Sequence, residues 1–111
     1  MTQNLDPIRL DAAFEWDEAN INKNWIKHGV RWSECEEVFQ QTPFVVALDS
    51  RHSSFERRYG VLGRTASGRG LAVFFTMRGS RIRVISARDM NRREAEEVRH
   101  VQETEADPQV P

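Results

Sequence analysis

The sequence contains a single cysteine, Cys35, and no long run of apolar residues. One cysteine cannot form a disulfide within the chain, and without a CxxC pair or a Cys/His cluster we expect no structural zinc site. No segment approaches the roughly 20 apolar residues that cross a bilayer, and charged residues interrupt any signal-like pattern at the N-terminus. We therefore expect a soluble protein of a reducing cytoplasm that does not associate with membranes.

Lysine is absent from the middle of the chain, although this is its most basic part. Residues 51–93 contain 11 arginines and only two acids, a net charge of +9, whereas residues 1–50 and 94–111 each carry −5. The total of −1 hides this separation. Arginine presents a planar fork of donors that matches phosphate, stays charged and stacks on bases. The arginine-rich segment therefore predicts a phosphate-binding surface for RNA or DNA.

The length of 111 residues indicates one domain, with no internal repeats. We assign an N-terminal arm to residues 1–13, the domain to 14–103 and a C-terminal tail to 104–111. Periodicity, caps and turn residues predict the secondary structure. The expected elements are a short strand at 14–16, helices at 18–28, about two turns after Ser33 and 92–102, and strands at 44–48, 56–62, 71–77 and 81–87.

Short turns join the last three strands, so neighbouring strands must be antiparallel. The order of the elements predicts an α+β fold in which helices pack on one face of an antiparallel sheet. In the first helix, Ile21, Trp25 and His28 form the expected inward stripe, and Asn20, Lys23, Asn24 and Lys27 the exposed side. Ser33 and Glu36 match a capping box for the second helix. The expected core aromatics are Trp16, Trp25, Trp32, Phe39, Phe44, Phe74 and Phe75.

Several segments, taken in this order, resemble the BrnT-type toxins. They are FEWDEANINKNWIKHGV at 14–30, VF at 38–39, LGR at 62–64 and RIRVISAR at 81–88. The resemblance covers roughly residues 14–99 and implies a RelE-like fold. It also implies an endoribonuclease that cleaves mRNA and stops translation, as the toxin of a type II toxin–antitoxin pair.

The resemblance further implies which residues act and which molecules bind. The implied functional positions are Lys27, His28, Glu56, Arg64 and an arginine of the last strand, Arg83 or Arg88. The implied partners are an RNA substrate and a BrnA-like antitoxin, whose ribbon-helix-helix domain would bind operator DNA. No metal or other cofactor is expected.

Metal-free RNA cleavage needs a base for the ribose 2′-OH, an acid for the leaving 5′-oxygen and cations around the phosphorane. His28 and Glu56 are the candidates for proton transfer, and the residues do not decide which is acid and which is base. Surrounding cations should keep Glu56 ionised. By the two-residue alternation of a strand, Arg58 and Arg64 share a face with Glu56, and Arg81 shares one with Arg83. We take His28, Glu56, Arg64 and Arg83 as catalytic, and Lys27, Arg58, Arg81 and Arg88 as RNA-binding.

Each assignment has a simpler alternative. His28 can be a packing residue, Lys27 a solvated lysine and Glu56 an ion-pair partner of Arg57 or Arg58. Arg69 sits in a turn, where electrostatic steering or plain exposure is expected. A metal site formed by Asp49, His52 and Glu56 is conceivable and disfavoured.

Two other functions use the same charge pattern. The first is a non-catalytic module of a repressor complex that binds nucleic acid or antitoxin. The second is a protein-interaction module whose basic segment meets an acidic partner. The acidic residues 94–111 could also fold over the basic surface as a lid.

Overall fold

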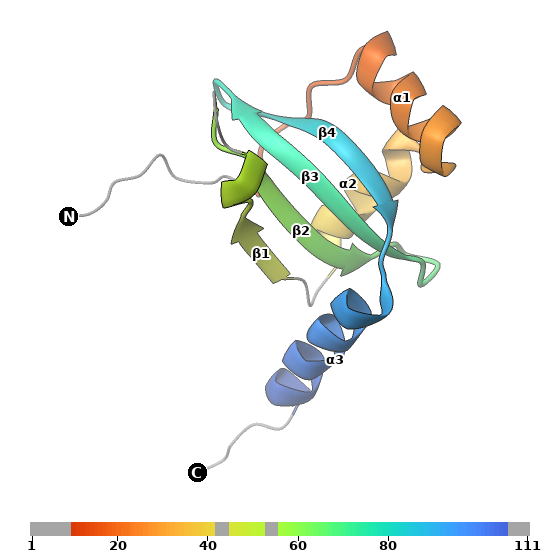
Figure 1. Cartoon of the computed structure of the whole chain (residues 1–111), viewed down its shortest axis with the longest axis vertical. Helices are drawn as coiled ribbons and strands as arrows, with labels where there is room; N and C mark the ends of the chain where they lie inside the picture. The colour runs from red at the N-terminus through yellow and green to blue at the C-terminus, as the bar shows by residue number, and fades with distance from the viewer. Residues whose placement is uncertain (1–9, 42–44, 53–55, 107–111) are drawn as a thin grey trace, which may run out of the picture.

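The computed structural model describes residues 10–41, 45–52 and 56–106. In these residues, helices border a four-stranded antiparallel sheet whose strands lie side by side in chain order (Figure 1). The elements are α1 Glu18–His28, α2 Trp32–Gln40, β1 Val45–Leu48, the 3₁₀ turn η1 Ser50–His52, β2 Tyr59–Arg64, β3 Gly70–Arg78, β4 Arg81–Asp89 and α3 Arg92–Ala106. The predicted α+β class is confirmed. No helix of these residues is long and apolar enough to span a membrane.

The predicted boundaries differ from the observed ones mainly at β2. The strand expected to start at Glu56 starts at Tyr59, because the pairing of β1 with β2 ends at Leu48 and Tyr59. Beyond that pair, the Asp49 N–H donates to the Arg58 carbonyl and closes the connection. The strand expected at 14–16 is reduced to a single bridge between Phe14 and Ile82. Phe44 and part of the connection between η1 and β2 lie outside the described residues.

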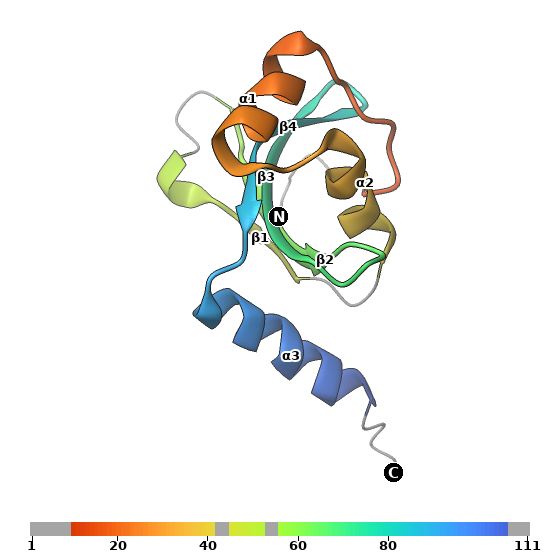
Figure 2. The ribbon, with the colours of Figure 1, turned by 90° about the vertical axis from the view of Figure 1, so that its right-hand side faces the viewer.

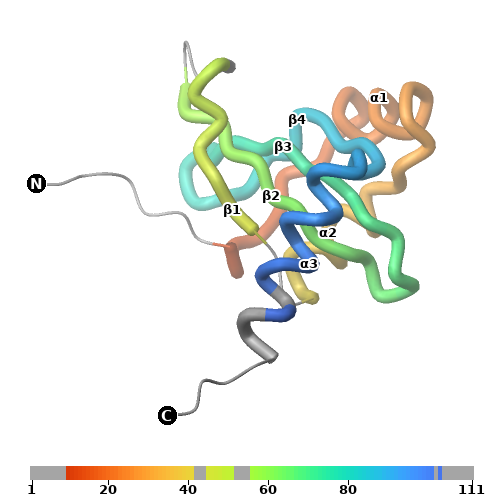
Figure 3. Tube along the Cα trace, turned by 60° about the horizontal axis from the view of Figure 1, so that its bottom comes forward, coloured from red at the N-terminus to blue at the C-terminus, as the bar shows by residue number. Residues whose placement is uncertain are grey.

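Helix α2 covers one face of the curved sheet (Figure 2). Its Cys35, Val38 and Phe39 pack against inward residues of the strands, and Phe39 meets Phe75 edge-on with ring centroids 5.2 Å apart. The other inward residues include Tyr59, Val61, Val73 and Val84. Helix α3 is not on this face: it begins beside β1 and β2 and extends away from the sheet (Figures 1 and 3). The single-face arrangement of the helices is therefore wrong for α3.

The orientation of α1 is the reverse of the one predicted from its apolar stripe. Asn20 and Asn24 are buried, whereas Trp25 is 51% exposed. The two asparagines face the free edge of β4: Asn20 Nδ2 donates to the Val84 carbonyl, and the Ala87 N–H donates to Asn24 Oδ1. Backbone of residues 13–15 bonds Ile82 on the same edge. Hydrogen-bonding needs of a sheet edge, which no helical periodicity reveals, thus decide which side of α1 is inside.

Replacing Asn24 by Ala is expected to lower the free energy of unfolding by about 1–3 kcal/mol, because the buried Ala87 N–H loses its acceptor. Asn22 is the matched control, since it lies on the same helix and is exposed. Its replacement by Ala should change the stability by less than about 0.5 kcal/mol. Urea unfolding of both variants measures the difference, and equal effects would contradict the edge-capping role.

The start of α2 also differs from the predicted capping box. The helix begins at Trp32, and Arg31 is the N-terminal capping residue. Glu34, three residues later, accepts the Arg31 backbone N–H at 2.9 Å. Ser33 and Glu36 lie inside the helix, where Glu36 accepts the indole N–H of Trp16 at 2.8 Å. The carboxylate two positions earlier therefore takes the capping role.

Candidate functional site

Arginines gather on the face of the sheet opposite α2. Tyr59, Val61 and Val73 point into the core, so the alternate residues of β2, β3 and β4 point to the other side. The register places Gly60 opposite Phe74, Phe74 opposite Ser86, Ala72 opposite Arg88 and Thr76 opposite Arg83. We call this surface the arginine face and define it by Arg58, Arg64, Phe74, Arg81, Arg83 and Arg88.

In the middle of the arginine face, the ring of Phe74 lies between two arginines, and each arginine is paired with a carboxylate. The guanidinium carbons of Arg58 and Arg88 lie 5.3 and 5.4 Å from the centroid of Phe74. Asp49 binds Arg58 with Oδ2 3.2 Å from Nε, and Glu94 binds Arg88 through two bonds of 2.8 and 2.9 Å. Both forks are held in place by a ring and a carboxylate. Arg88 lowers the pKa of Glu94, and Glu94 raises the pKa of Arg88.

Gly60 leaves room for one edge of the Phe74 ring on the neighbouring strand. A Cβ at Gly60 would stand 3.1 Å from Cε1 of Phe74, closer than ordinary contacts allow. The ring therefore uses the space that a side chain at this position would fill. Any larger residue at position 60 would push the ring away from Arg58 and Arg88.

A second cluster lies where β3 turns into β4. Glu56 binds Arg78 with bonds of 3.0 and 3.2 Å, and the Arg78 guanidinium is the main cause that lowers the pKa of Glu56. Thr76 and Arg83 lower this pKa further. The ionised Glu56 predicted from its cationic neighbours is confirmed. Its ion-pair partner, however, is Arg78 of β3, not the adjacent Arg57 or Arg58 of the sequence interpretation.

Arg83 is linked to the start of α1. Its Nη1 lies 3.0 Å from both Glu15 Oε2 and Asp17 Oδ2, and its side chain is only 17% exposed. Arg83 is also the main cause that lowers the pKa of Asp17, the N-cap of α1. Arg83 therefore fastens α1 to the sheet in addition to facing the arginine cluster.

Arg64 and Arg81 stand at opposite ends of the arginine face. Both are exposed, and Arg64 donates to the Gly68 carbonyl in the turn between β2 and β3. Arg81 lies opposite Arg78 in the register of β3 and β4, next to the turn that joins these two strands. The five predicted arginines Arg58, Arg64, Arg81, Arg83 and Arg88 thus lie on one side of the sheet.

His28 and Lys27 lie away from this surface, at the end of α1 beyond the edge of β4. His28 is half-buried and acts electrostatically on Asp89, the last residue of β4, whereas Glu56 binds Arg78 at the opposite end of the sheet. From Arg81 to Asp89 the strand covers roughly 25 Å at about 3.3 Å per residue. One phosphate therefore cannot contact both Glu56 and His28.

Arg69 has a structural position that the sequence interpretation missed. Its Nε lies 2.7 Å from Asp89 Oδ1, and Nη1 lies 3.1 Å from Glu34 Oε1 and 3.0 Å from the Gly29 carbonyl. The guanidinium joins the end of α1, the start of α2 and the end of β4. Because its partners are far from Arg69 in the sequence, the position of Arg69 in a turn did not indicate this role.

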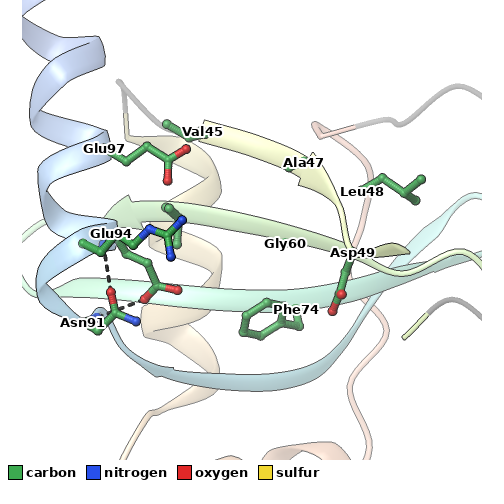
Figure 4. Close-up of a pocket in the computed structure, with 11 residues that line it drawn as sticks. Val45, Ala47, Leu48, Asp49, Gly60, Phe74, Asn91, Glu94 and Glu97 are labelled. Atoms are coloured by element: carbon green, nitrogen blue, oxygen red, sulfur yellow. Dashed lines mark hydrogen bonds between the residues drawn. The ribbon is translucent and has the colours of Figure 1, made fainter. Parts of the chain in front are cut away.

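A hollow of about 330 Å³ borders the arginine face where α3 begins (Figure 4). Small and apolar residues of the sheet line it, among them Ala47, Gly60, Leu62 and Phe74. On the other side, Asn91 and Glu94 exchange backbone-to-side-chain bonds in the first turn of α3, and Glu97 extends from the next turn. Glu94 is the acidic residue that reaches Arg88, so the lid predicted for residues 94–111 has one contact of this kind in the described part of α3.

Phe74 belongs to the site although it was predicted in the core. Phe74 and Phe75 are adjacent on a strand, and only one of two neighbours can face the core. This alternation was the available signal. The disfavoured metal set is not assembled either: Asp49 binds Arg58 and Glu56 binds Arg78, and the part of the chain that is described contains no group of three or more potential ligands.

Comparison with known proteins gives one family. A family model described as ribonuclease toxin, BrnT, of type II toxin–antitoxin system matches residues 16–94, more than half of the chain. The match contains the whole arginine face and confirms the resemblance noted in the sequence. A type II toxin has an antitoxin protein as partner, and a ribonuclease has RNA as substrate. No curated protein matches the chain.

Proposed function

Because this chain belongs to the BrnT family of ribonuclease toxins of type II toxin–antitoxin systems, we propose that it is a metal-independent endoribonuclease of mRNA. Cleavage would proceed by attack of a ribose 2′-OH and would inhibit translation in the cytoplasm. The observation that supports this best is the arginine face, where five arginines lie on one side of the sheet and two of them, Arg58 and Arg88, lie against the ring of Phe74. Its antitoxin would carry a ribbon-helix-helix domain and connect the complex to operator DNA.

The RNA backbone would lie along the arginine face. The guanidiniums of Arg58 and Arg88 lie over the Phe74 ring, which suits phosphates bound beside a stacked base. Arg64 and Arg81 would bind phosphates at either end. In the free protein, the guanidiniums of Arg58 and Arg88 are paired with the carboxylates of Asp49 and Glu94. Phosphate oxygens of RNA would replace these carboxylates, since carboxylate and phosphate both accept hydrogen bonds from arginine in similar geometry.

We assign the proton transfer to Glu56. Its ionised carboxylate would accept the proton of the 2′-OH, the 2′-oxygen would form a bond to phosphorus, and the bond from phosphorus to the 5′-oxygen would break. Water would supply the proton that the departing 5′-oxygen takes up, and the carboxyl of Glu56 would then lose its proton to solvent, so the products are a 2′,3′-cyclic phosphate and a free 5′-hydroxyl. Arg83 and Arg81 would stabilise the extra negative charge of the phosphorane. His28 and Lys27 are left out of this step because they lie beyond the edge of β4.

Cleavage is expected to stop when the 2′-OH at the mapped cleavage site is replaced by hydrogen or a methoxy group, because the nucleophile is then missing. The measurement is gel analysis of an mRNA fragment with the purified protein, and mass spectrometry of the ends for a cyclic phosphate. Activity should persist in excess chelator.

Two results would contradict this proposal. One is cleavage of the 2′-deoxy substrate, which would require another nucleophile. The other is intact RNA after long incubation together with salt-sensitive binding, with a log–log slope near −0.7 per neutralised phosphate. The second result would favour a non-catalytic nucleic-acid-binding module.

A further inference from the structure

Two acids at the start of α1 hold one arginine of the arginine face. Nη1 of Arg83 donates to Glu15 Oε2 and to Asp17 Oδ2, both at 3.0 Å, and Nη2 donates to Asp17 Oδ1 at 3.3 Å. The side chain of Arg83 is 17% exposed. These bonds fix both the position and the rotation of the guanidinium, because they fall on two of its nitrogens.

The pattern of these bonds leaves one edge of the guanidinium for another acceptor. A guanidinium has five N–H groups, and the three bonds to Glu15 and Asp17 use three of them. The two that remain, one on Nε and one on Nη2, lie side by side along one edge of the planar group. Among the described residues, none accepts a hydrogen bond from this edge. Such a fork matches two oxygens of a phosphate.

Arg83 also lies near the proposed general base, Glu56. The pKa of this carboxyl group is lowered mainly by Arg78 and further by Thr76 and Arg83. Thr76 is the register partner of Arg83 on the neighbouring strand. A phosphate held by the free edge of Arg83 would therefore bring the adjoining ribose 2′-OH close to Glu56.

The backbone that carries the two acids is itself attached to β4. The Glu15 N–H donates to a carbonyl of this strand at 2.8 Å. Asp17 caps α1 and exchanges hydrogen bonds with Asn20, whose Nδ2 donates to the carbonyl of Val84, the residue after Arg83. The carboxylates thus reach the guanidinium from a fixed support. Groups held in this way need no rearrangement when charge develops in a transition state.

We propose that Asp17, assisted by Glu15, is a positioning residue that turns the free edge of the Arg83 guanidinium toward the phosphate that is cleaved. Each carboxylate lowers the local positive charge, so the contact does not serve to raise RNA affinity. It supplies a fixed orientation of a long side chain, which stabilises the phosphorane more than the bound substrate. The inference rests on the proposed function, because it assigns Arg83 to the phosphorane.

Asp17→Asn separates this positioning from the structural use of Asp17 as a helix cap. Asparagine caps a helix about as well as aspartate, because its side-chain oxygen accepts the same backbone N–H. It carries no charge, however, and its amide has only one acceptor oxygen, so it cannot bind both terminal nitrogens of Arg83 as a carboxylate does. The variant therefore keeps α1 and releases the guanidinium.

Asp17→Asn is expected to lower kcat of RNA cleavage by roughly 10- to 100-fold, because the guanidinium is no longer aligned. Its affinity for a 2′-methoxy RNA fragment should stay equal or become tighter, since one negative charge is removed. Glu18→Gln is the matched control: it removes the same charge one residue later, and Glu18 is exposed and has no bond to Arg83. It should keep kcat within about threefold of the parent.

A double-mutant cycle tests whether Asp17 acts through Arg83. In an Arg83→Gln chain, Asp17→Asn should cause no further loss of kcat. Equal losses in both backgrounds overturn the inference, and so does a kcat of Asp17→Asn within about threefold of the parent. If Asp17→Asn fails to fold, Glu15→Gln replaces it in the cycle, because Glu15 is outside the helix cap and accepts one of the three bonds.

Nitrogen NMR of the Arg83 Nε–H distinguishes this inference from the proposed function. The signal is assigned by its absence in Arg83→Gln, and in the parent chain it should shift when the 2′-methoxy RNA fragment is added. In Asp17→Asn the signal should broaden and respond less to the fragment. If the parent gives these signals but does not cleave RNA, only the proposed function is refuted. A signal that ignores RNA in the parent, or that is the same in parent and variant, overturns the inference.

Discussion

Glu56→Gln is expected to lower the rate constant of RNA cleavage by about 10²–10⁴-fold, the usual contribution of a general base. Gln keeps the size of the side chain and removes the proton acceptor. Arg78 loses its partner but stays exposed, so the fold should be maintained. RNA affinity should not fall, because a negative charge has been removed from a cationic surface. Single-turnover cleavage and filter binding measure the two quantities.

The pH dependence of cleavage distinguishes Glu56 from His28. Arg78 lowers the pKa of Glu56 below its ordinary value, so the carboxylate stays ionised at more acidic pH than an unpaired glutamate does. The acid limb of kcat/KM should therefore lie below the ordinary range of a glutamate, whereas an ordinary imidazole base gives a limb near 6.5. Arg78→Gln removes the main cause of the shift and should move the limb upward.

His28→Gln is the matched control and should leave the cleavage rate within about threefold of the parent, as expected of a residue outside the site. A limb near 6.5, lost together with activity in His28→Gln, would contradict the assignment of the base to Glu56. Full activity of Glu56→Gln would contradict it as well. In that case Glu56 would be only the ion-pair partner of Arg78.

Arg69→Gln is expected to lower the free energy of unfolding by about 2–3 kcal/mol, because several charged and carbonyl partners lose one shared donor. In a domain of this size the melting temperature should fall by roughly 10–20 °C. Most of the loss should come from Glu34 and the Gly29 carbonyl, since Asp89 is 64% exposed and better screened. Calorimetry measures the shift.

Arg78→Gln is the matched control, because it also removes an arginine from an ion pair but does so at an exposed site. Arg78 and Glu56 are each nearly half exposed, so breaking their pair should cost less than about 1 kcal/mol. Equal melting temperatures for the Arg69 and Arg78 variants would show that Arg69 is not the link between α1, α2 and β4. A large fall in melting temperature for both variants would indicate that stability depends on the total positive charge of the chain and not on the specific contacts of Arg69.

The sequence by itself determined the class of fold, the family and the basic surface. Short turns at Gly68 and Gly79 impose antiparallel neighbours, and both glycines have positive φ. Asp17 caps α1 and Gly29 ends it, as local residue chemistry predicts. These features depend on residues near one another in the chain.

Only the tertiary structure decided which side of α1 is buried and which candidates meet. Asn20 and Asn24 are inside because the edge of β4 needs hydrogen-bond partners more than the core needs Ile21 and Trp25. Strand register brought the arginines to one surface and left His28 at its far edge. The bonds of Asn20 and Asn24 to β4 join residues more than 60 positions apart, and the local sequence pattern around either partner does not indicate the other.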